Sequence, residues 1–306
     1  EVIVPSFTFV STANAFVLRG GVPVFVDIRS DTFNMDENRI EDAVTGKTRA
    51  VVPVHYAGVP CAMDEIMDIA IRRNLFVIED AAQALLSTYR GKCLGTIGHL
   101  GCLSFHETKN IISGEGGALL VNDERFIRRA EIIREKGTNR ARFFRGEVDK
   151  YSWVDIGSSY LPSEIIGAFL YAQMEQAETI VIKRRMLFET YWGMLKPIAD
   201  KGCIRLPDRS HEGVSNGHIF SIVTGSLDER TRLIGHLHRQ GIHAVFHYVP
   251  LHSSPAGRRF GRTVGSMDVT DLISERLLRL PLYYEMDEAM VHIVGEVVMR
   301  FYQGKG

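Results

Sequence analysis

The chain has 306 residues, of which 45% are hydrophobic and 24% charged, and its formal net charge is -1. This length allows a large core, and the near-neutral charge argues against nucleic acid or an anionic membrane as the main partner. No apolar run reaches the roughly 18 residues of a membrane span. The four cysteines lack CxxC spacing, so we expect reduced thiols in a cytoplasmic protein and no metal site.

The chain begins on a strand-like run, EVIVPSFTFV, without an initiator methionine. A strand this apolar normally joins a sheet with other elements upstream, so we expect that the N-terminal part of the domain is missing. Short β-branched runs then alternate with amphipathic segments. Strands are predicted over 2–5, 22–28, 48–56, 75–82, 101–106 and 117–123, and helices over 12–20, 35–45 and 63–74. This alternation predicts an α/β fold with a mostly parallel sheet, which binds ligands beyond the carboxyl ends of its strands.

A charged helix is predicted over 122–136, and long helical material with few breakers over 161–195. Beyond it the pattern becomes α+β. Strands are predicted over 218–225 and 242–249, and helices over 228–241 and 270–281. We therefore expect a large domain over 1–190 and a smaller C-terminal domain over 191–306.

Lys109 lies between an apolar run and three glycines, in SFHETKNIISGEGG. A solvated loop lysine is the simplest interpretation. A Walker-type phosphate loop is excluded because its glycines precede the lysine, whereas here they follow it. The remaining hypothesis is an amine nucleophile at a strand end, where partial burial lowers the pKa.

Asp80 ends the apolar run FVIED. A carboxylate there is costly unless it meets a cation, such as a protonated pyridine nitrogen, although a helix N-cap is an equally physical role. Ser104 could donate to a phosphate or simply bond to backbone. Phe9 could stack on a planar ring, with the small Ala82 against the other face, although an aromatic at a strand end is more often core.

Two similar motifs, VPVHYAG and FHYVPLH, contain His55, Tyr56, His247 and Tyr248. Each pair could cap a strand end or form a wall of a sugar or nucleotide pocket. Nothing near the second motif completes a metal triad, so zinc is rejected. In REKGTNRARFFRG, Arg140 and its neighbours could bind a diphosphate or form a solvated loop, and the two interpretations carry equal weight.

PSFTFVSTANA, VPVHYAG, IEDAAQA, SFHETKN with GEGG, and FHYVPLH occur in this order. Together they resemble the pyridoxal-phosphate-dependent sugar-nucleotide aminotransferases of the DegT/DnrJ type, over essentially the whole chain. The resemblance implies the aspartate-aminotransferase fold (PLP fold type I) and a homodimer with shared active sites. REKGTNR, FRGEVDKY and DIGSSYL are most similar to the branch that makes dTDP-4-amino-4,6-dideoxygalactose for enterobacterial common antigen.

The resemblance also implies residue roles. Lys109 would bind pyridoxal 5'-phosphate (PLP) covalently, and Asp80 would pair with its ring nitrogen. Gln83 would lie against its phenolic oxygen. The remaining cofactor contacts would be the ring-stacking Phe9 and Ala82, the phosphate-binding Ser104, and Ser159, which occupies the position where many relatives place an asparagine that reaches the partner's phosphate.

The predicted reaction moves an amino group from glutamate to C4 of dTDP-4-keto-6-deoxyglucose, with Lys109 as covalent anchor and general acid and base. Three alternatives remain. A related sugar 3- or 4-aminotransferase is one. A dehydratase is disfavoured, because it would lack the lysine. The third is a non-catalytic paralogue or regulatory protein on the same fold, and its best support is the expected absence of the upstream phosphate-binding turn.

Overall fold

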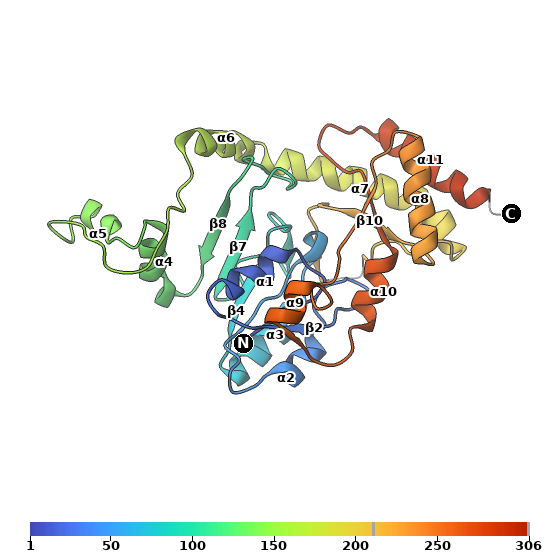
Figure 1. The fold of residues 1–306 in the computed structure, drawn as a ribbon. Helices are drawn as coiled ribbons and strands as arrows, with labels where there is room; N and C mark the ends of the chain where they lie inside the picture. The colour runs from blue at the N-terminus through green and yellow to red at the C-terminus, as the bar shows by residue number, and fades with distance from the viewer. Residues whose placement is uncertain (210–211, 305–306) are drawn as a thin grey trace.

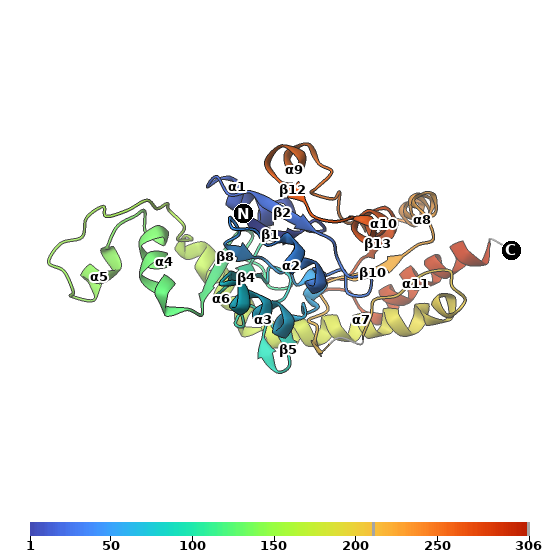
Figure 2. The same cartoon turned by 90° about the horizontal axis from the view of Figure 1, so that it is seen from below.

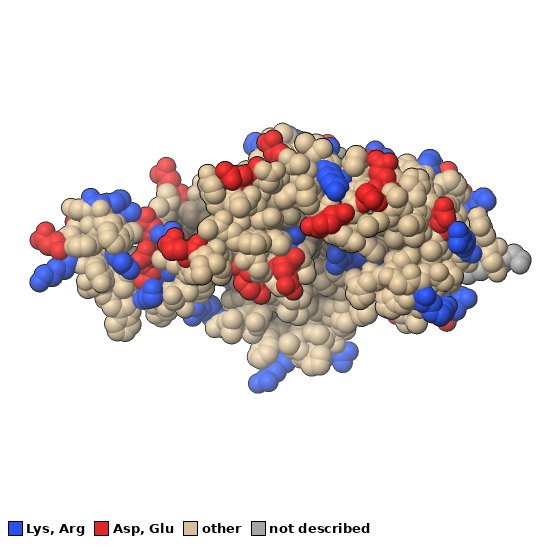
Figure 3. Space-filling model, turned by 90° about the horizontal axis from the view of Figure 1, so that it is seen from above, with Lys and Arg blue, Asp and Glu red and all other residues tan. Residues whose placement is uncertain are grey.

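A computed structural model describes residues 1–209 and 212–304. Two regions are joined by the long helix α7 (Ala177–Asp200), and an arm projects from the opposite end of the molecule (Figures 1 and 2). Within the described residues, no helix is long and apolar enough to cross a membrane. Acidic and basic side chains are interspersed over the face in Figure 3, in keeping with the small net charge.

The large region is built on a seven-stranded sheet with the order β12-β2-β1-β3-β4-β7-β8. All neighbours are parallel except β7 and β8, so the predicted mostly parallel sheet is confirmed. The strands are β1 (Val2–Pro5), β2 (Pro23–Val26), β3 (Ala50–Val51), β4 (Phe76–Asp80), β7 (Leu100–Ser104), β8 (Gly117–Val121) and β12 (Arg262–Thr263).

Helices pack on this sheet through apolar faces. The helix α3 (Met63–Arg73) buries Met63, Ile66, Ile69 and Ala70 against the sheet core. Its ends are stabilised by acidic residues in the first turn, basic residues in the last turn and a left-handed Asn74 that ends the helix. The other helices of this region are α1 (Val10–Val17), α2 (Ile40–Ala43), α9 (Pro255–Phe260) and α10 (Asp268–Arg276).

The small region pairs a three-stranded antiparallel sheet with helices. The sheet has the order β10-β13-β11, formed by β10 (Phe220–Val223), β13 (Leu277–Leu280) and β11 (Val245–Phe246). Helices α7, α8 (Leu227–Arg239) and α11 (Glu288–Gln303) share one core with this sheet. Leu278 and Leu280 point into that core, so alternation directs Leu277 and Arg279 to the other face.

The helix predicted over 270–281 is wrong in its second half. α10 ends at Arg276, and the following four residues form β13, the central strand of the small sheet. The apolar residues of LLRL fit both the helical and the strand periodicity. The segment forms a strand because it pairs with β10 on one side and β11 on the other.

The sheet pairings divide the chain more finely than a boundary near residue 190. That position falls inside α7, which runs unbroken to Asp200. After the small-region strands begin, β12 returns to pair with β2 in the large sheet. The segment 191–306 therefore contributes to both regions.

The arm extends from β8 through α4 (Ile127–Arg134) and α5 (Arg140–Phe144) to α6 (Glu164–Glu175), on the left in Figure 1. Many of its large apolar side chains are exposed, and Trp153 reaches 79% exposure. A short antiparallel sheet, β6 (Lys92–Cys93), β5 (Thr88–Tyr89) and β9 (Gly213–Val214), connects the β4–β7 loop to the segment that follows α7.

Candidate active site

Lys109 follows the carboxyl end of β7, beside the carboxyl end of β4. Asp80 pairs in register with Cys102 of β7, and the backbone N–H of Lys109 donates to the carbonyl of His106 at 2.9 Å. The later loop needs glycine: at Gly116, with φ +154°, an added Cβ would lie 2.7 Å from the Ser113 hydroxyl. The glycines therefore permit the tight return into β8.

The Lys109 amine is half-buried and has no hydrogen-bond or ion-pair partner among residues 1–209 and 212–304. Burial lowers its pKa, the Asp80 carboxylate raises it, and the Arg279 guanidinium lowers it again, with a net shift below the ordinary value. A desolvated amine with a lowered pKa and no partner is suited to attack a carbonyl carbon.

The Asp80 carboxylate is held in one orientation. Its Oδ2 accepts from the Thr12 hydroxyl of α1 at 2.7 Å, and its Oδ1 accepts from the Ala82 N–H at 3.2 Å. Neither donor is a cation, so the carboxylate keeps its charge available for a positively charged group.

Gln83 connects the two regions. Its side-chain oxygen accepts from the Ala57 N–H at 2.7 Å, and its amide group donates to the Tyr248 hydroxyl at 3.1 Å. These two bonds fix the orientation of the buried amide. Its predicted contact with a cofactor oxygen stays a prediction.

Tyr56, His247 and Tyr248 form one group at the domain junction. The His247 ring stacks on Tyr248 with centroids 4.1 Å apart, and its Nδ1 lies 3.2 Å from the Tyr56 hydroxyl. Its Nε2 lies 2.6 Å from Nη1 of Arg279. Burial, with the charges of Arg279 and Lys109, lowers the pKa of His247 to about 3, so the ring is neutral and accepts from the guanidinium.

The sequence interpretation missed Arg279, because its segment was taken as helix. LLRL by itself gave no signal, because its apolar residues satisfy both the helix and the strand period; only the pairing of β13 with its neighbours puts Arg279 on the face opposite Leu278 and Leu280.

The structure places His55 inside the core, which does not support its predicted role in a substrate wall. Its side chain is 0% exposed, Nε2 lies 2.9 Å from Glu79 Oε2, and Nδ1 accepts from the Cys61 N–H at 3.2 Å. Both ring nitrogens are occupied inside the core. The two histidines of the HY motifs therefore have different surroundings, although Tyr56 of the first motif packs against His247 and Tyr248 of the second.

Three further predicted cofactor residues lie at the end of β7, after β4 and just before α1. Ser104 ends β7, and its hydroxyl oxygen accepts from the His106 N–H at 3.4 Å. Phe9 lies just before α1 and is 59% exposed, and Ala82 is half-buried. Their roles toward the ring and phosphate remain predictions.

Arg140 begins α5 and Ser159 precedes α6, so both residues lie in the arm that projects from the sheet (Figure 1). Ser159 is exposed and forms a backbone bridge with Glu135. The guanidinium of Arg140 lies over the rings of Phe144 and Tyr151, at 5.0 and 5.8 Å from the centroids.

A buried amide network next to Lys109 was also missed. The Asn110 side chain donates to the carbonyl of Asn216 at 3.2 Å, and its oxygen lies 2.8 Å from Nδ1 of His218. Burial holds the pKa of His218 well below its usual range, so a neutral N–H donates to Asn110. Asn216 in turn donates to the carbonyls of Gln83 and Leu85, at 2.9 Å each. The network fixes the residue that follows Lys109.

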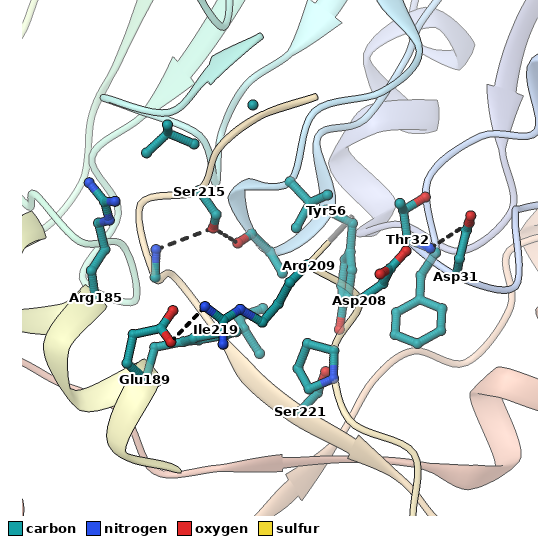
Figure 4. Close-up of a pocket in the computed structure, with 18 residues that line it drawn as sticks. Asp31, Thr32, Tyr56, Arg185, Glu189, Asp208, Arg209, Ser215, Ile219 and Ser221 are labelled. Carbon is teal, nitrogen blue, oxygen red and sulfur yellow. Dashed lines mark hydrogen bonds and ion pairs between the residues drawn. The ribbon is translucent and has the colours of Figure 1, made fainter. Parts of the chain in front are cut away.

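A cleft of about 190 Å³ is lined in part by Tyr56, and neither Lys109 nor Asp80 lines it. Figure 4 shows Arg209 reaching across it to Glu189 of α7, with 3.0 Å between charged atoms. Ser215 donates to the Ala57 carbonyl at 3.4 Å. The cleft is separate from the Lys109 group but shares Tyr56 with it. Among the described residues, no cluster of His, Cys, Asp or Glu could hold a metal ion.

The chemistry of this set suits PLP, an aldehyde with a basic ring nitrogen and a phosphate. Lys109 offers an unpartnered amine, and Asp80 offers a held carboxylate without a cation. Ser104 offers a hydroxyl hydrogen that no described acceptor takes. The residues present therefore fit the predicted cofactor.

Comparisons with known proteins agree with this set. The chain is 31% identical to a GDP-perosamine synthase of Escherichia coli O157:H7 over 100% of its length and 80% of that protein. It is 33% identical to a pleiotropic regulatory protein of Geobacillus stearothermophilus, over 99% of this chain and 78% of that one. The PMP form of a putative sugar aminotransferase, Spr1654 of Streptococcus pneumoniae, superposes with a TM-score of 0.89 at 25% identity, covering 99% of this chain and 82% of that one.

The predicted fold class, that of PLP-dependent aminotransferases, is confirmed by these structures. Aminotransferases of this type depend on PLP, so the predicted cofactor is confirmed as well. The model of the DegT/DnrJ/EryC1/StrS aminotransferase family matches residues 1–299, and the chain belongs to that family.

Proposed function

We propose that the protein transfers the amino group of glutamate to C4 of a nucleotide-linked 4-keto-6-deoxyhexose, with dTDP-4-keto-6-deoxyglucose as the substrate to test first. The observation that carries the proposal is the unpartnered Lys109 amine, which burial and Arg279 keep at a lowered pKa beside the Asp80 carboxylate. The four free cysteines suit a reducing cytoplasm, where we place the reaction.

PLP, when bound, supplies a carbonyl that takes up the amino group and a ring that withdraws electrons from the reacting carbon. Lys109 would hold the cofactor through its amine. Once displaced by the donor, the same amine can take a proton from the reacting carbon and return it at the other end, because its pKa lies below that of a free lysine.

Asp80 would hold the ring nitrogen in its protonated form, since an ionised carboxylate at hydrogen-bond distance favours the charged partner. Thr12 and the Ala82 N–H keep the carboxylate aimed. Gln83 would face the phenolic oxygen, in the orientation that its bonds to Ala57 and Tyr248 set.

The sugar would lie against His247 and Tyr248, which meet Tyr56 at the domain junction. Stacked aromatic rings with polar edges suit a pyranose, which has apolar faces and a polar rim. Nothing in this group distinguishes dTDP from other nucleotides, and one relative is named for a GDP-linked product. The GDP-linked 4-keto sugar is therefore the second substrate to test.

We also propose a homodimer in which each arm completes the partner's site with Arg140 and Ser159. The support is the apolar surface of the arm, where exposed large side chains are more concentrated than a monomer's surface would favour. These residues are Phe143, Phe144, Tyr151, Trp153, Ile156, Tyr160 and Leu161.

A regulatory protein on the same fold is the second candidate, because one relative is named as a pleiotropic regulatory protein. Such a protein could bind PLP and still transfer no amino group. Only the aminotransferase would form a 4-amino sugar, and this product can be measured.

The test is to incubate the PLP-loaded protein with glutamate and each 4-keto sugar nucleotide, and to identify the product by NMR. We expect a 4-amino sugar from one of them. Lys109→Ala should abolish both the product and the absorbance of covalently bound cofactor. Lys92→Ala, on the exposed strand β6, is the matched control and should retain both. Product formation by Lys109→Ala, or cofactor binding without product in the unaltered protein, would contradict the proposal.

A further inference from the structure

The segment 6–12 leads from β1 into α1 and reaches the Asp80 carboxylate. The Thr12 hydroxyl donates its single hydrogen to Asp80 Oδ2 at 2.7 Å, and its oxygen lies 3.0 Å from the Thr8 hydroxyl. Since Thr12 has no hydrogen left to give, Thr8 is the donor of that second bond. Both threonines are buried. The direction of the Asp80 carboxylate therefore depends on where the segment 6–12 holds these two hydroxyls.

The same segment contacts the aromatic group at the domain junction. Phe7 is 1% exposed, and its ring meets Tyr56 and Tyr248 edge-on, with centroids 5.2 and 5.4 Å apart. Tyr248 belongs to the segment 247–252, the HYVPLH stretch of the C-terminal part of the chain. A shift of the segment 6–12 would therefore change both the carboxylate and the proposed sugar wall.

Ser6 fixes the start of the segment 6–12 to the end of the segment 247–252. Its carbonyl accepts from the Leu251 N–H at 3.0 Å. Its hydroxyl oxygen accepts from the His252 N–H at 3.0 Å and lies 2.7 Å from Nδ1 of the same histidine. Ser6 is 0% exposed. Three hydrogen bonds thus join residues that are 246 positions apart in the chain.

The roles of these atoms follow from the hydrogens available. If Nδ1 of His252 carried the proton of the neutral ring, the buried Ser6 hydroxyl hydrogen would have no described acceptor. Buried donors are almost always paired, so the hydroxyl donates to Nδ1 and the ring proton lies on Nε2. Nε2 in turn lies 3.5 Å from Oδ1 of Asp271. Serine, histidine and aspartate also occur in this order in hydrolases, but a serine with 0% exposure cannot reach a substrate.

The support behind His252 is itself attached to the large sheet. Asp271 lies in α10, and the first turn of that helix is held by Asp27, which follows β2. The Asp27 carboxylate is buried and accepts from the N–H groups of Val269 and Thr270 at 3.0 and 2.8 Å. The histidine ring therefore has a fixed framework on its far side as well as Ser6 on its near side.

We propose that His252 is a positioning residue for the cofactor: by accepting from Ser6, it sets the segment 6–12 so that Thr12 aims the Asp80 carboxylate at the ring nitrogen. This inference rests on the role of Asp80 in the proposed function. It gives the last histidine of HYVPLH a task different from that of His247, which lies in the aromatic group five residues earlier.

The bound cofactor reports on the aim of Asp80 without any turnover. A protonated ring nitrogen favours loss of the proton from the bond that joins Lys109 to the cofactor, because two positive charges on one conjugated group repel each other. His252→Leu removes the acceptor for Ser6, so the ring nitrogen should hold its proton less well. We expect the pH midpoint of the absorbance change of the bound cofactor to rise by roughly half a unit. Asp80→Asn should raise it further.

Kinetics and a rescue variant separate positioning from folding. In His252→Leu, kcat should fall roughly tenfold, the scale of a misplaced catalytic group, while the KM of glutamate and of the sugar nucleotide stays within about twofold. His252→Asn keeps an acceptor oxygen close to the place of Nδ1 and should restore both kcat and the pH midpoint to within about threefold and 0.2 unit of the unaltered protein. His238→Leu is the matched control, because that ring bonds to the Ala244 carbonyl within the small region.

A double-mutant cycle tests the route through Ser6. Ser6→Ala should reproduce the effects of His252→Leu, and the double variant should lose no more than either single one, because both changes remove the same bond. All measurements are made on the PLP-loaded protein, well below the Tm of each variant.

Four outcomes would overturn the inference. A lowered Tm in His252→Leu with the pH midpoint and kcat unchanged would leave the histidine a purely structural role. No rescue by His252→Asn would show that Nδ1 does not act as the acceptor. Additive losses in the double variant would exclude the route through Ser6. A raised KM for the sugar nucleotide alone would assign His252 to the sugar wall. If the unaltered protein aminates no sugar, the proposed function fails, whereas the pH midpoint still reports on His252.

Discussion

Neighbouring residues of β4, Glu79 and Asp80, lie in two polar clusters that differ in how completely their atoms are paired. On one face of the strand, Glu79 is 0% exposed and accepts from His55 and from three backbone N–H groups. On the other face, Asp80 accepts only from Thr12 and Ala82, beside cations that lack an ion-pair partner among residues 1–209 and 212–304.

The difference separates structure from chemistry within one strand end. The Glu79 cluster closes the loop of Gly95, Ile97 and Gly98 against the sheet, and its oxygens have no capacity left for a ligand. The Asp80 cluster is incompletely paired, because Thr12 and the Ala82 N–H fix the orientation of the carboxylate without neutralising its charge. Buried polar groups without partners are therefore a better guide to this site than polar residues as such.

The largest expected effect comes from removing the negative charge of the Asp80 cluster. Asp80→Asn keeps the size and shape of the side chain, replaces one of its two acceptor oxygens by an NH2 donor, and leaves the cofactor's ring nitrogen without its counter-ion. We expect kcat/KM to fall about 10³-fold, the scale for breaking a buried charge pair. Steady-state kinetics measures this, and an unchanged Tm would show that the loss is chemical. A loss below tenfold would remove Asp80 from the proposed role.

A substitution in the Glu79 cluster should instead lower the stability and leave the activity unchanged. Glu79→Gln points an amide N–H at backbone donors, so we expect about 3 kcal/mol less stability, with the activity of the folded fraction retained. Urea unfolding of the PLP-loaded protein measures the first quantity, and kinetics at low temperature the second. If activity fell without a change in stability, Glu79 would have a chemical role, and the assignment of a purely structural role to its cluster would be wrong.

The amide network beside Lys109 should give an intermediate result. Asn110→Ala removes the bonds to Asn216 and His218 and loosens the lysine without touching its charge partners. We expect kcat to fall roughly tenfold, as for a loss of about 1.4 kcal/mol in positioning, with KM for glutamate unchanged. Ser113→Ala, in the same loop, is the control. A KM effect in place of a kcat effect would contradict the positioning role.

The smallest expected effect is the pH dependence of the stability that the Glu79 cluster contributes. Burial alone would raise the pKa of Glu79, but the bond from His55 and those from backbone N–H groups outweigh it, and the pKa lies below the ordinary 4.5. Its contribution to stability is therefore complete above pH 4.5 and is lost as the pH falls through the lowered pKa. The stability difference between the unaltered protein and Glu79→Gln should shrink by on the order of 1 kcal/mol across that acid range, measured by urea titration at each pH.

Part of this arrangement can be predicted from the sequence. Asp80 and Lys109 each follow an apolar run, and the carboxyl ends of parallel strands meet at one edge, so local pattern is enough to bring them together. The sequence motifs are also sufficient to predict the family and its cofactor.

The rest depends on contacts between distant segments. Whether a histidine after a strand faces the core or a pocket is decided by its neighbours, and for His55 that neighbour is Glu79, 24 residues away. Arg279 contacts His247 only because β13 forms between β10 and β11. No local period in LLRL reports that pairing, since four residues are too few to separate helix from strand.

The pairing of β12 with β2 has a consequence for biosynthesis. Arg262 and Thr263 lie against Val24 and Phe25, so the outer edge of β2 stays open on the ribosome until most of the chain has been made. An uncovered parallel edge offers backbone groups to other chains, and contacts of such long sequence separation form slowly. The β2 edge is therefore the edge of the large sheet that its own partner strand covers last during synthesis.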